Sequence, residues 1–363
     1  MKSIKSGNKI NYSLSLQDSM LIKGVAICFM LWHHLFYEHP EYGKIVQYSA
    51  FFGKVCIAMF LFVSAYGLTI QFSKINVFRL EASVGKETLK FIAKRLLKLY
   101  VNYWVIFLIF LPLGILFFNK SLQISYGIQG NHVYHLILDF FGMQGSESYN
   151  STWWFYQLII MLYLLFPLLY IAVKKWNIAI LVLFFVILGS HYYKIPIIHD
   201  WLFPFALGIS CALNSDRITS FINRINKMIL IGFISILFLF IVYIRLVNWR
   251  TGGSGVDGLF TLVWIMILVL TVRDVKIVTP VLKYLGKHSM NIFMVHTFIF
   301  YYFYPDFIYS FRYPVLIFII LISCSLGISI LIEYCKKIMG IYGFENKIID
   351  MFQTTKTSNK ITN

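Results

Sequence analysis

The chain has 363 residues, of which 59% are hydrophobic and only 13% are charged, and its formal net charge is +17. Soluble globular proteins carry about 25% charged residues, so this composition excludes an ordinary soluble domain and predicts a polytopic membrane protein. The positive charges lie where cytoplasmic membrane loops need them, and no compact basic module is visible, so no nucleic-acid partner is expected.

Ten apolar segments are predicted to cross the membrane, since a spanning helix needs roughly 20 mostly apolar residues. They cover residues 20–37, 50–72, 100–118, 152–173, 177–192, 196–213, 228–247, 257–272, 289–304 and 314–335. A further segment, 135–143, fits a short re-entrant or interfacial helix. The sequence therefore predicts an all-α fold of about ten transmembrane helices.

The distribution of Lys and Arg predicts the orientation of these spans. Of the 32 residues, 24 lie in the termini and in loops 73–99, 174–176, 214–227 and 273–288, whereas the opposite loops hold six. Because basic residues concentrate on the cytoplasmic side, we expect both termini in the cytoplasm. Residues 1–18 then form a cytoplasmic segment, 19–338 the membrane domain and 339–363 a polar, solvated tail.

The five cysteines are expected to be small packing residues. They are Cys28, Cys56, Cys211, Cys324 and Cys335, and all lie in or at the ends of apolar runs. Their number is odd and no C-x-x-C pattern occurs, so the sequence predicts neither a disulfide framework nor a metal site.

The first span carries the most informative spacing of the chain. Lys23 and His34 are eleven residues apart, which is three helical turns plus about 20°, so both side chains share one face and are separated by roughly 16 Å along the axis. Ionisable residues at membrane depth usually mark a functional path. We interpret His34 as a general base. The alternatives are a histidine bonded to a neighbouring helix and a lysine that snorkels to the headgroups. His33, rotated by about 100°, is expected to face packing or solvent.

A second candidate site precedes the third span. Arg95 and Lys98 are three residues apart at the predicted start of that helix, so they share a face. An arginine fork and a lysine charge suit the phosphates of a donor such as coenzyme A. The alternative is ordinary anchoring to anionic lipid.

Polar residues later in the chain have structural interpretations that we favour. Ser289 is expected to cap the ninth span, which places His296 two turns into the membrane in a structural or supporting role. Trp153 and Trp154 fit an interfacial aromatic belt, although they could also stack on a sugar ring.

His135 and Asp139 are four residues apart on a possible helix. They could form a base and its orienting carboxylate, but we favour a solvated loop surface.

Several separated pieces of the sequence occur in an order that points to one family. The pieces are Lys23 to His34, Val55 to Gly67, Arg95 to Tyr100, Trp154 with Tyr163 and Pro167, and Leu285 to Ser289 with His296. Together they resemble the membrane-bound acyltransferase 3 family, whose members O-acylate bacterial surface glycans. Lys23 and Lys98 stand where the family often has arginine, and no carboxylate follows Trp154 at residues 157–159.

The resemblance implies roles for the matching residues. His34 is the essential histidine, Lys23 is its cationic partner, and Arg95 with Lys98 contacts the acetyl-CoA donor. The residues expected to line the substrate are His33, Ser64, Trp154 and His296. The implied acceptor is a sugar hydroxyl of a surface or lipid-linked polysaccharide, at the bacterial cytoplasmic membrane and without a metal.

Two other classes of function remain open from the sequence. In a glycan transporter or flippase, the basic stripe would guide a lipid-linked phosphate. A membrane polysaccharide polymerase would more naturally show a large outside loop with several arginines, and residues 119–151 contain none.

Overall fold

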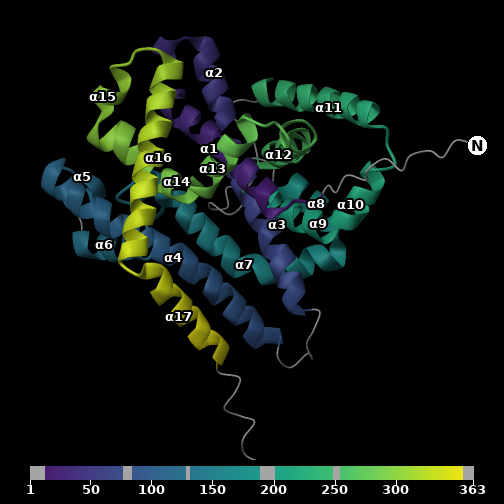
Figure 1. Ribbon diagram of the computed structural model, residues 1–363, viewed down its shortest axis with the longest axis horizontal. Coiled ribbons are helices and arrows are strands. Elements are labelled where there is room, and N and C mark those ends of the chain that lie inside the picture. The colour runs from purple at the N-terminus through teal and green to yellow at the C-terminus, as the bar shows by residue number, and fades with distance from the viewer. Residues whose placement is uncertain (1–12, 77–83, 128–130, 189–200, 248–253, 355–363) are drawn as a thin grey trace, which may run out of the picture. The chain divides into compact units, whose positions relative to one another are not determined.

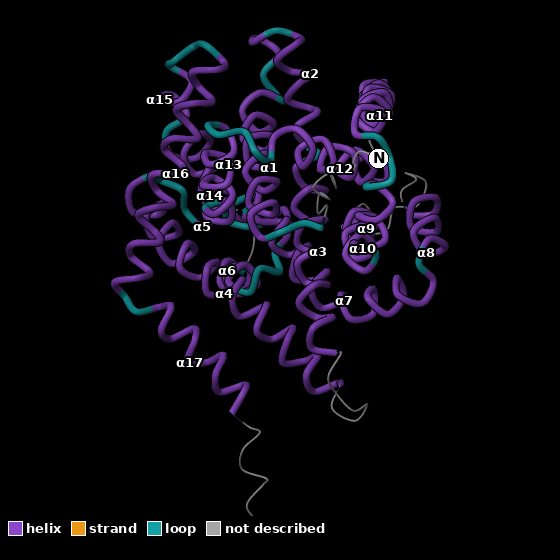
Figure 2. The backbone as a smooth tube through the Cα atoms, turned by 45° about the vertical axis from the view of Figure 1, so that its right-hand side comes forward, coloured by secondary structure: helices purple, strands orange, loops and turns teal. Residues whose placement is uncertain are grey.

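A computed structural model describes residues 13–76, 84–127, 131–188, 201–247 and 254–354 (Figure 1). Within these ranges all regular structure is helical and no strand occurs, as Figure 2 shows. Seven of the described segments are long and apolar enough to cross a membrane. The predicted all-α, polytopic membrane fold is confirmed.

The candidate spans agree with seven of the ten predicted ones. They are Leu16–Phe36, Lys44–Ile75, Gly85–Phe117, Ser151–Trp176, Lys227–Val247, Gly255–Val272 and Pro314–Ile338. The predicted spans 177–192 and 196–213 fall partly on residues 189–200, which lie outside the described residues, and otherwise on shorter helices. The predicted span 289–304 falls on two shorter helices. The count of ten and the cytoplasmic placement of both termini stay predictions.

The predicted membrane domain, residues 19–338, is divided between two compact units. Unit 1 comprises Met1–Lys74 and Leu168–Lys287, and unit 2 comprises Ile75–Pro167 and His288–Asn363. The boundary inside helix α7 (Trp154–Trp176) falls at Pro167, where the missing N–H and the ring of a proline interrupt the helical bonding pattern.

Unit 1 is built around its first helix. Its helices are α1 (Leu16–Phe36), η1 (Pro40–Tyr42), α2 (Lys44–Gly53), α3 (Cys56–Asn76), α8 (Ile178–Leu183), η5 (Phe184–Leu188), α9 (Leu202–Leu213), α10 (Ser215–Ile222), α11 (Lys227–Val247), α12 (Ser254–Ile267), η7 (Leu268–Val272) and α13 (Val278–Lys287). α1 and α13 lie side by side (Figure 1) and form the most extensive helix pair of the unit.

Two glycines allow α1 and α13 to touch through their backbones. A Cβ atom on Gly24 would overlap the carbonyl of Leu282, and one on Gly286 would overlap the carbonyl of Met20. Small residues at such a crossing let two helix backbones approach closely. Gly286, part of the family-like sequence piece, therefore has an architectural role.

The two ends of α1 are also fixed within unit 1. At the start, Ser15 and Asp18 form a capping box, and the guanidinium of Arg273 forms an ion pair with Asp18. Near the end, a Cβ atom on Gly53 would overlap the Phe29 carbonyl, so α2 packs directly on α1. The position of the helix is thus set at both ends and at the glycine crossing.

Unit 2 is built around α4, the longest described helix. Its elements are α4 (Val84–Phe117), α5 (Leu122–Tyr126), α6 (His132–Phe140), η3 (Gly145–Glu147), η4 (Ser151–Trp153), most of α7, α14 (Ser289–Thr297), η8 (Phe298–Phe303), α15 (Pro305–Tyr309), α16 (Pro314–Ile338) and α17 (Ile341–Thr354). The segment predicted as a polar tail thus contains α17, which follows α16 and lies beside α4 (Figure 1).

The glycine crossing yields a testable prediction about stability. Replacing Gly286 by Ala should lower the free energy of unfolding by about 1–3 kcal/mol, because the added methyl meets backbone that cannot move aside cheaply. Thermal unfolding of the purified protein in detergent measures the effect.

Gly67, in the interior of α3, provides the matched control because a Cβ atom there meets open space. Gly67→Ala should leave stability unchanged or raise it by up to about 1 kcal/mol, since alanine is the better helix former. Equal unfolding temperatures for Gly286→Ala and the wild type would contradict the role of the crossing.

Candidate active site

Helix α1 carries the two residues predicted to be catalytic. It runs without interruption from Leu16 to Phe36, so the helical spacing of Lys23 and His34 holds. Both side chains are half-buried. Gly24 faces α13, and helical geometry turns Lys23 and His34 about 80–100° away from that crossing, onto one flank of the helix.

His33 and His34 lie in a small aromatic cluster at the end of α1. Their ring centroids are 5.1 Å apart, and Tyr37 stacks on His33 at 4.7 Å. Nδ1 of His33 lies 2.8 Å from the carbonyl oxygen of Ala50 in α2. This bond fixes the ring of His33 against α2, in agreement with the predicted packing role.

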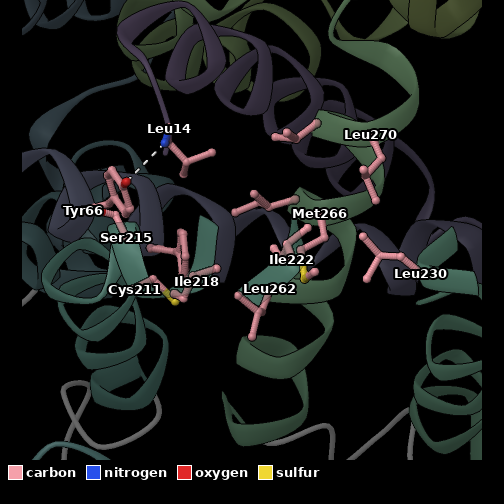
Figure 3. Close-up of a pocket in the computed structure, with 13 residues that line it drawn as sticks. Leu14, Tyr66, Cys211, Ser215, Ile218, Ile222, Leu230, Leu262, Met266 and Leu270 are labelled. Atoms are coloured by element: carbon pink, nitrogen blue, oxygen red, sulfur yellow. Dashed lines mark hydrogen bonds between the residues drawn. The ribbon is translucent and has the colours of Figure 1, made fainter. Parts of the chain in front are cut away.

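Ser64 lies half-buried on α3, the helix that also contributes to an apolar pocket of unit 1 (Figure 3). The pocket is lined by Leu14, Phe62, Tyr66, Cys211, Ser215, Ile218, Ile222, Leu230, Leu262, Ile265, Met266, Val269 and Leu270. The N–H of Leu14 donates to the Tyr66 hydroxyl at 3.1 Å.

This pocket is not where the predicted chemistry lies. Leu14 precedes the first turn of α1, whereas His34 lies in its last turn, roughly 30 Å further along the axis. The lining suits an alkyl or acyl chain, since few polar groups face it. Lys23 and His34, the residues predicted to be catalytic, do not line this pocket.

In unit 2, Arg95 and Lys98 lie on α4, which confirms that their segment is helical and that they share a face. The Arg95 guanidinium lies 5.4 Å from the ring centroid of Phe91. Lys98 Nζ lies 3.5 Å from Oε1 of Glu345 on α17. A carboxylate thus occupies the position beside Lys98 that an anionic ligand would take.

The aromatic-belt prediction is wrong for Trp153. Its side chain is 1% exposed, and its indole N–H donates to the carbonyl of Met294 at 3.2 Å. The indole therefore joins η4 to α14 inside unit 2. Trp154 is half-buried and makes an edge contact with Phe155 at 6.2 Å.

His296 is fully buried in α14. Its Nδ1 lies 2.8 Å from the Phe293 carbonyl, and its Nε2 lies 3.2 Å from the Thr297 hydroxyl. Both ring nitrogens therefore have partners close in sequence, which supports the structural interpretation of this histidine.

The predicted cap of this helix is wrong by one residue. Ser289 lies in the first turn of α14 and His288 occupies the cap position. The imidazole of His288 bonds the Ser329 hydroxyl at 2.9 Å, and so connects α14 to α16.

The interpretation of Asp139 as part of a solvated surface is also wrong. Asp139 is fully buried, and burial raises the pKa of its carboxyl group. Its oxygens accept from the Tyr126 hydroxyl at 2.8 Å, the Tyr149 N–H at 2.5 Å and the Tyr103 hydroxyl at 3.0 Å. The carboxyl group is a hub that joins α4, α5, α6 and the segment before η4.

Lys120, beside this hub, is 8% exposed. Its ammonium lies 3.6 Å from the ring centroid of Tyr302 and 4.8 Å from that of Tyr149. Burial lowers the pKa of Lys120 to about 8. The aromatic faces supply cation–π attraction, but they do not replace the water that the ammonium has lost.

Unit 1 contains a buried ion pair that the sequence did not predict: Arg245 is one of the six basic residues assigned above to the loops opposite the cytoplasm. Arg245 Nε lies 2.8 Å from Oδ1 of Asp257, and the two side chains are 5% and 1% exposed. The only sequence signal is that each residue lies within three positions of the end of an apolar run. The pairing itself requires the packing of α11 on α12.

The described residues contain no cluster of three or more His, Cys, Asp or Glu side chains that could hold a metal ion. All five cysteines are free thiols.

These features define a polytopic, helical membrane protein whose first helix presents a cation and an imidazole on one flank. The chain belongs to the acyltransferase 3 family: the sequence model of its acyltransferase domain matches residues 18–334. The protein is therefore a membrane acyltransferase. No curated protein and no solved structure shows significant similarity to the chain.

The environment of Lys120 predicts a pH dependence of stability. The folded protein releases the Lys120 proton near pH 8, whereas the unfolded chain holds it up to about pH 10.4. Stability should therefore rise between these values as pH increases. The unfolding temperature of wild type and Lys120→Met, measured from pH 7 to 10, should show this rise only in the wild type.

Lys44→Met is the control, because Lys44 is exposed at the start of α2. This variant should keep the wild-type pH profile. If the unfolding temperature of Lys120→Met rises with pH as it does in the wild type, the rise does not come from the buried Lys120 amine.

Proposed function

We propose that this acyltransferase moves an acetyl group from cytoplasmic acetyl-CoA to a sugar hydroxyl of a cell-surface or lipid-linked polysaccharide, at the bacterial cytoplasmic membrane. The observation that carries the proposal is the unbroken helix α1, which holds Lys23 and His34 on one flank in a chain of the acyltransferase 3 family. An imidazole and a cation held at membrane depth are costly unless they serve a function.

Arg95 and Lys98 are the proposed ligands of the donor's phosphates. A guanidinium binds phosphate through two parallel hydrogen bonds, and a lysine adds a point charge. The ion pair of Lys98 with Glu345 supports the assignment, because it shows that this position attracts an anionic oxygen. When acetyl-CoA binds, its phosphate replaces the carboxylate.

His34 acts on the acceptor. In its neutral form the imidazole accepts the proton of the sugar hydroxyl while the hydroxyl oxygen attacks the thioester carbonyl. The new C–O bond forms, the C–S bond breaks, and the imidazolium returns its proton to the departing thiolate. The alternative route transfers the acetyl group first to His34 and then to the sugar. Both routes require the same histidine.

Family membership favours a transferase over the two other classes of function. A flippase needs no thioester, and a polymerase needs no acyl donor. The proposal therefore depends on thioester consumption coupled to glycan modification, which neither alternative produces.

Replacing His34 by Ala should reduce acetyl transfer by about 10²–10⁴-fold, the usual contribution of a general base, or abolish it if the acetyl group passes through the imidazole. Membrane abundance should stay unchanged. Mass spectrometry of the surface glycan measures the loss of acetyl groups in cells that carry the variant.

His39→Ala is the matched control, since His39 lies just after α1 and pairs with the exposed Glu41 at 2.6 Å. This variant should acetylate normally. Full activity of His34→Ala at wild-type abundance would refute the assignment of His34.

Substitutions at two positions of the proposed donor site should change KM for acetyl-CoA in opposite directions. Arg95→Gln should raise KM for acetyl-CoA by about tenfold or more, because a hydrogen bond to a charged group contributes roughly 1.5–3 kcal/mol. Glu345→Gln should lower this KM, because it removes the carboxylate that competes with phosphate at Lys98. Initial rates over a range of acetyl-CoA concentrations measure both effects.

Asp350→Asn removes the same charge from α17 five residues further along and is the control for Glu345. It should change KM much less. An unchanged KM in Glu345→Gln would contradict competition at Lys98.

A further inference from the structure

One face of α12 carries polar side chains that lack hydrogen-bond partners. Asp257, Thr261 and Trp264 follow the i, i+4, i+7 spacing of a single helix face. Among the described residues, neither carboxylate oxygen of Asp257, nor the Thr261 hydroxyl, nor the Trp264 indole N–H makes a hydrogen bond. Asp257 and Thr261 are fully buried. Buried polar groups without partners are uncommon and costly, and they call for an explanation.

Asp257, Thr261 and Trp264 form a polar strip along α12, and Arg245 of α11 faces its first residue, Asp257. Its Nε lies 2.8 Å from Asp257 Oδ1, yet neither atom has hydrogen-bond geometry toward a partner. The charges compensate each other, while Arg245 Nε and both carboxylate oxygens of Asp257 make no hydrogen bond. Replacing such a buried pair by apolar residues is often neutral or stabilising, so stability alone does not explain why charged residues stand there.

The strip lies at the end of unit 1 that carries the proposed catalytic histidine. The indole of Trp264 stacks on Phe29 of α1 with ring centroids 5.9 Å apart. Phe29 lies one turn before His33, whose ring is 5.1 Å from that of His34. Arg245 is close enough to His33 for its charge to act on the imidazole.

The contact that α11 makes within unit 1 involves few buried side chains. The buried residues of α11 are Leu230, Ile234, Ile241 and Arg245, so three apolar side chains and the ion pair hold it.

We propose that Asp257, Thr261 and Arg245 form a binding site for adjacent hydroxyl groups of the acceptor sugar, entered between α11 and α12. The carboxylate of Asp257, which makes no hydrogen bond, can accept from hydroxyl donors, the guanidinium of Arg245 can donate to a hydroxyl oxygen, and the Thr261 hydroxyl can do both. This donor and acceptor set matches a vicinal diol. The identity of the ligand rests on the proposed function. The three residues bind and position, and they take no part in bond making.

The test uses the full-length protein in lipid nanodiscs with methyl glycosides of glucose, galactose and mannose as probes. At least one glycoside should raise the unfolding temperature of the wild type, since a ligand of the native state stabilises it. Thr261→Val and the double variant Arg245→Leu/Asp257→Leu should lose that rise. In Thr261→Val, KM for the same glycoside in acetyl transfer should be at least tenfold higher, with KM for acetyl-CoA changed less than twofold.

The same variants exclude a purely structural role. Without ligand, Thr261→Val should unfold at or above the wild-type temperature, because it removes a buried hydroxyl that bonds nothing. Ser325→Ala is the matched control: its hydroxyl is also buried and unbonded, but it lies on α16 in unit 2. This variant should keep the full response to glycoside.

The outcomes separate this site from the proposed function. The proposed site is refuted if Thr261→Val and Arg245→Leu/Asp257→Leu both respond to glycoside as the wild type does. It is also refuted if no glycoside stabilises the wild type. If the wild type binds a glycoside through these residues but transfers no acetyl group to it, the site stands and the proposed reaction fails.

Discussion

The close approach of α1 and α13 at Gly24 and Gly286 is the contact on which the arrangement of unit 1 depends. Glycine at both positions lets the two backbones meet this closely, since a Cβ atom at either one would overlap a carbonyl group of the other helix. The crossing fixes both the height and the rotation of α1. With the rotation fixed, Lys23 and His34 are presented on one flank, and neither needs a partner on α13 to be held there.

Charges within the apolar segments follow one rule in both units. Each described ion pair of this kind joins or stiffens neighbouring elements: Asp18 with Arg273 at the start of α1, Arg245 with Asp257 between α11 and α12, and Glu333 with Lys336 within α16. In the pair of Arg245 with Asp257, which is buried on both sides, removing one partner would leave an uncompensated buried charge, which costs about 3–5 kcal/mol. The pairs therefore act as constraints on helix position even where they add little net stability.

The sequence could predict which residues share a face of one helix, because this depends only on their positions along that helix. The period of a helix places Lys23 with His34 and Arg95 with Lys98, and the structure keeps both helices continuous. It could not predict what depends on a distant partner. Trp153 looked like a belt residue because its bond to Met294 spans 141 positions. Asp139 looked solvated because the three tyrosines that enclose it lie up to 36 residues away.

Sequence pieces that resemble a family signature need not all serve chemistry. In the piece from Leu285 to Ser289, Gly286 permits the backbone contact with α1, and His288 caps α14 and bonds Ser329. Each of these two residues thus serves the packing of its own unit. The piece on α1 differs from residue to residue: Gly24 is required by packing, whereas its neighbour Lys23 is turned away from the crossing and is half-buried. The crossing with α13 therefore constrains residue 24 sterically and leaves the side chain at residue 23 outside that contact.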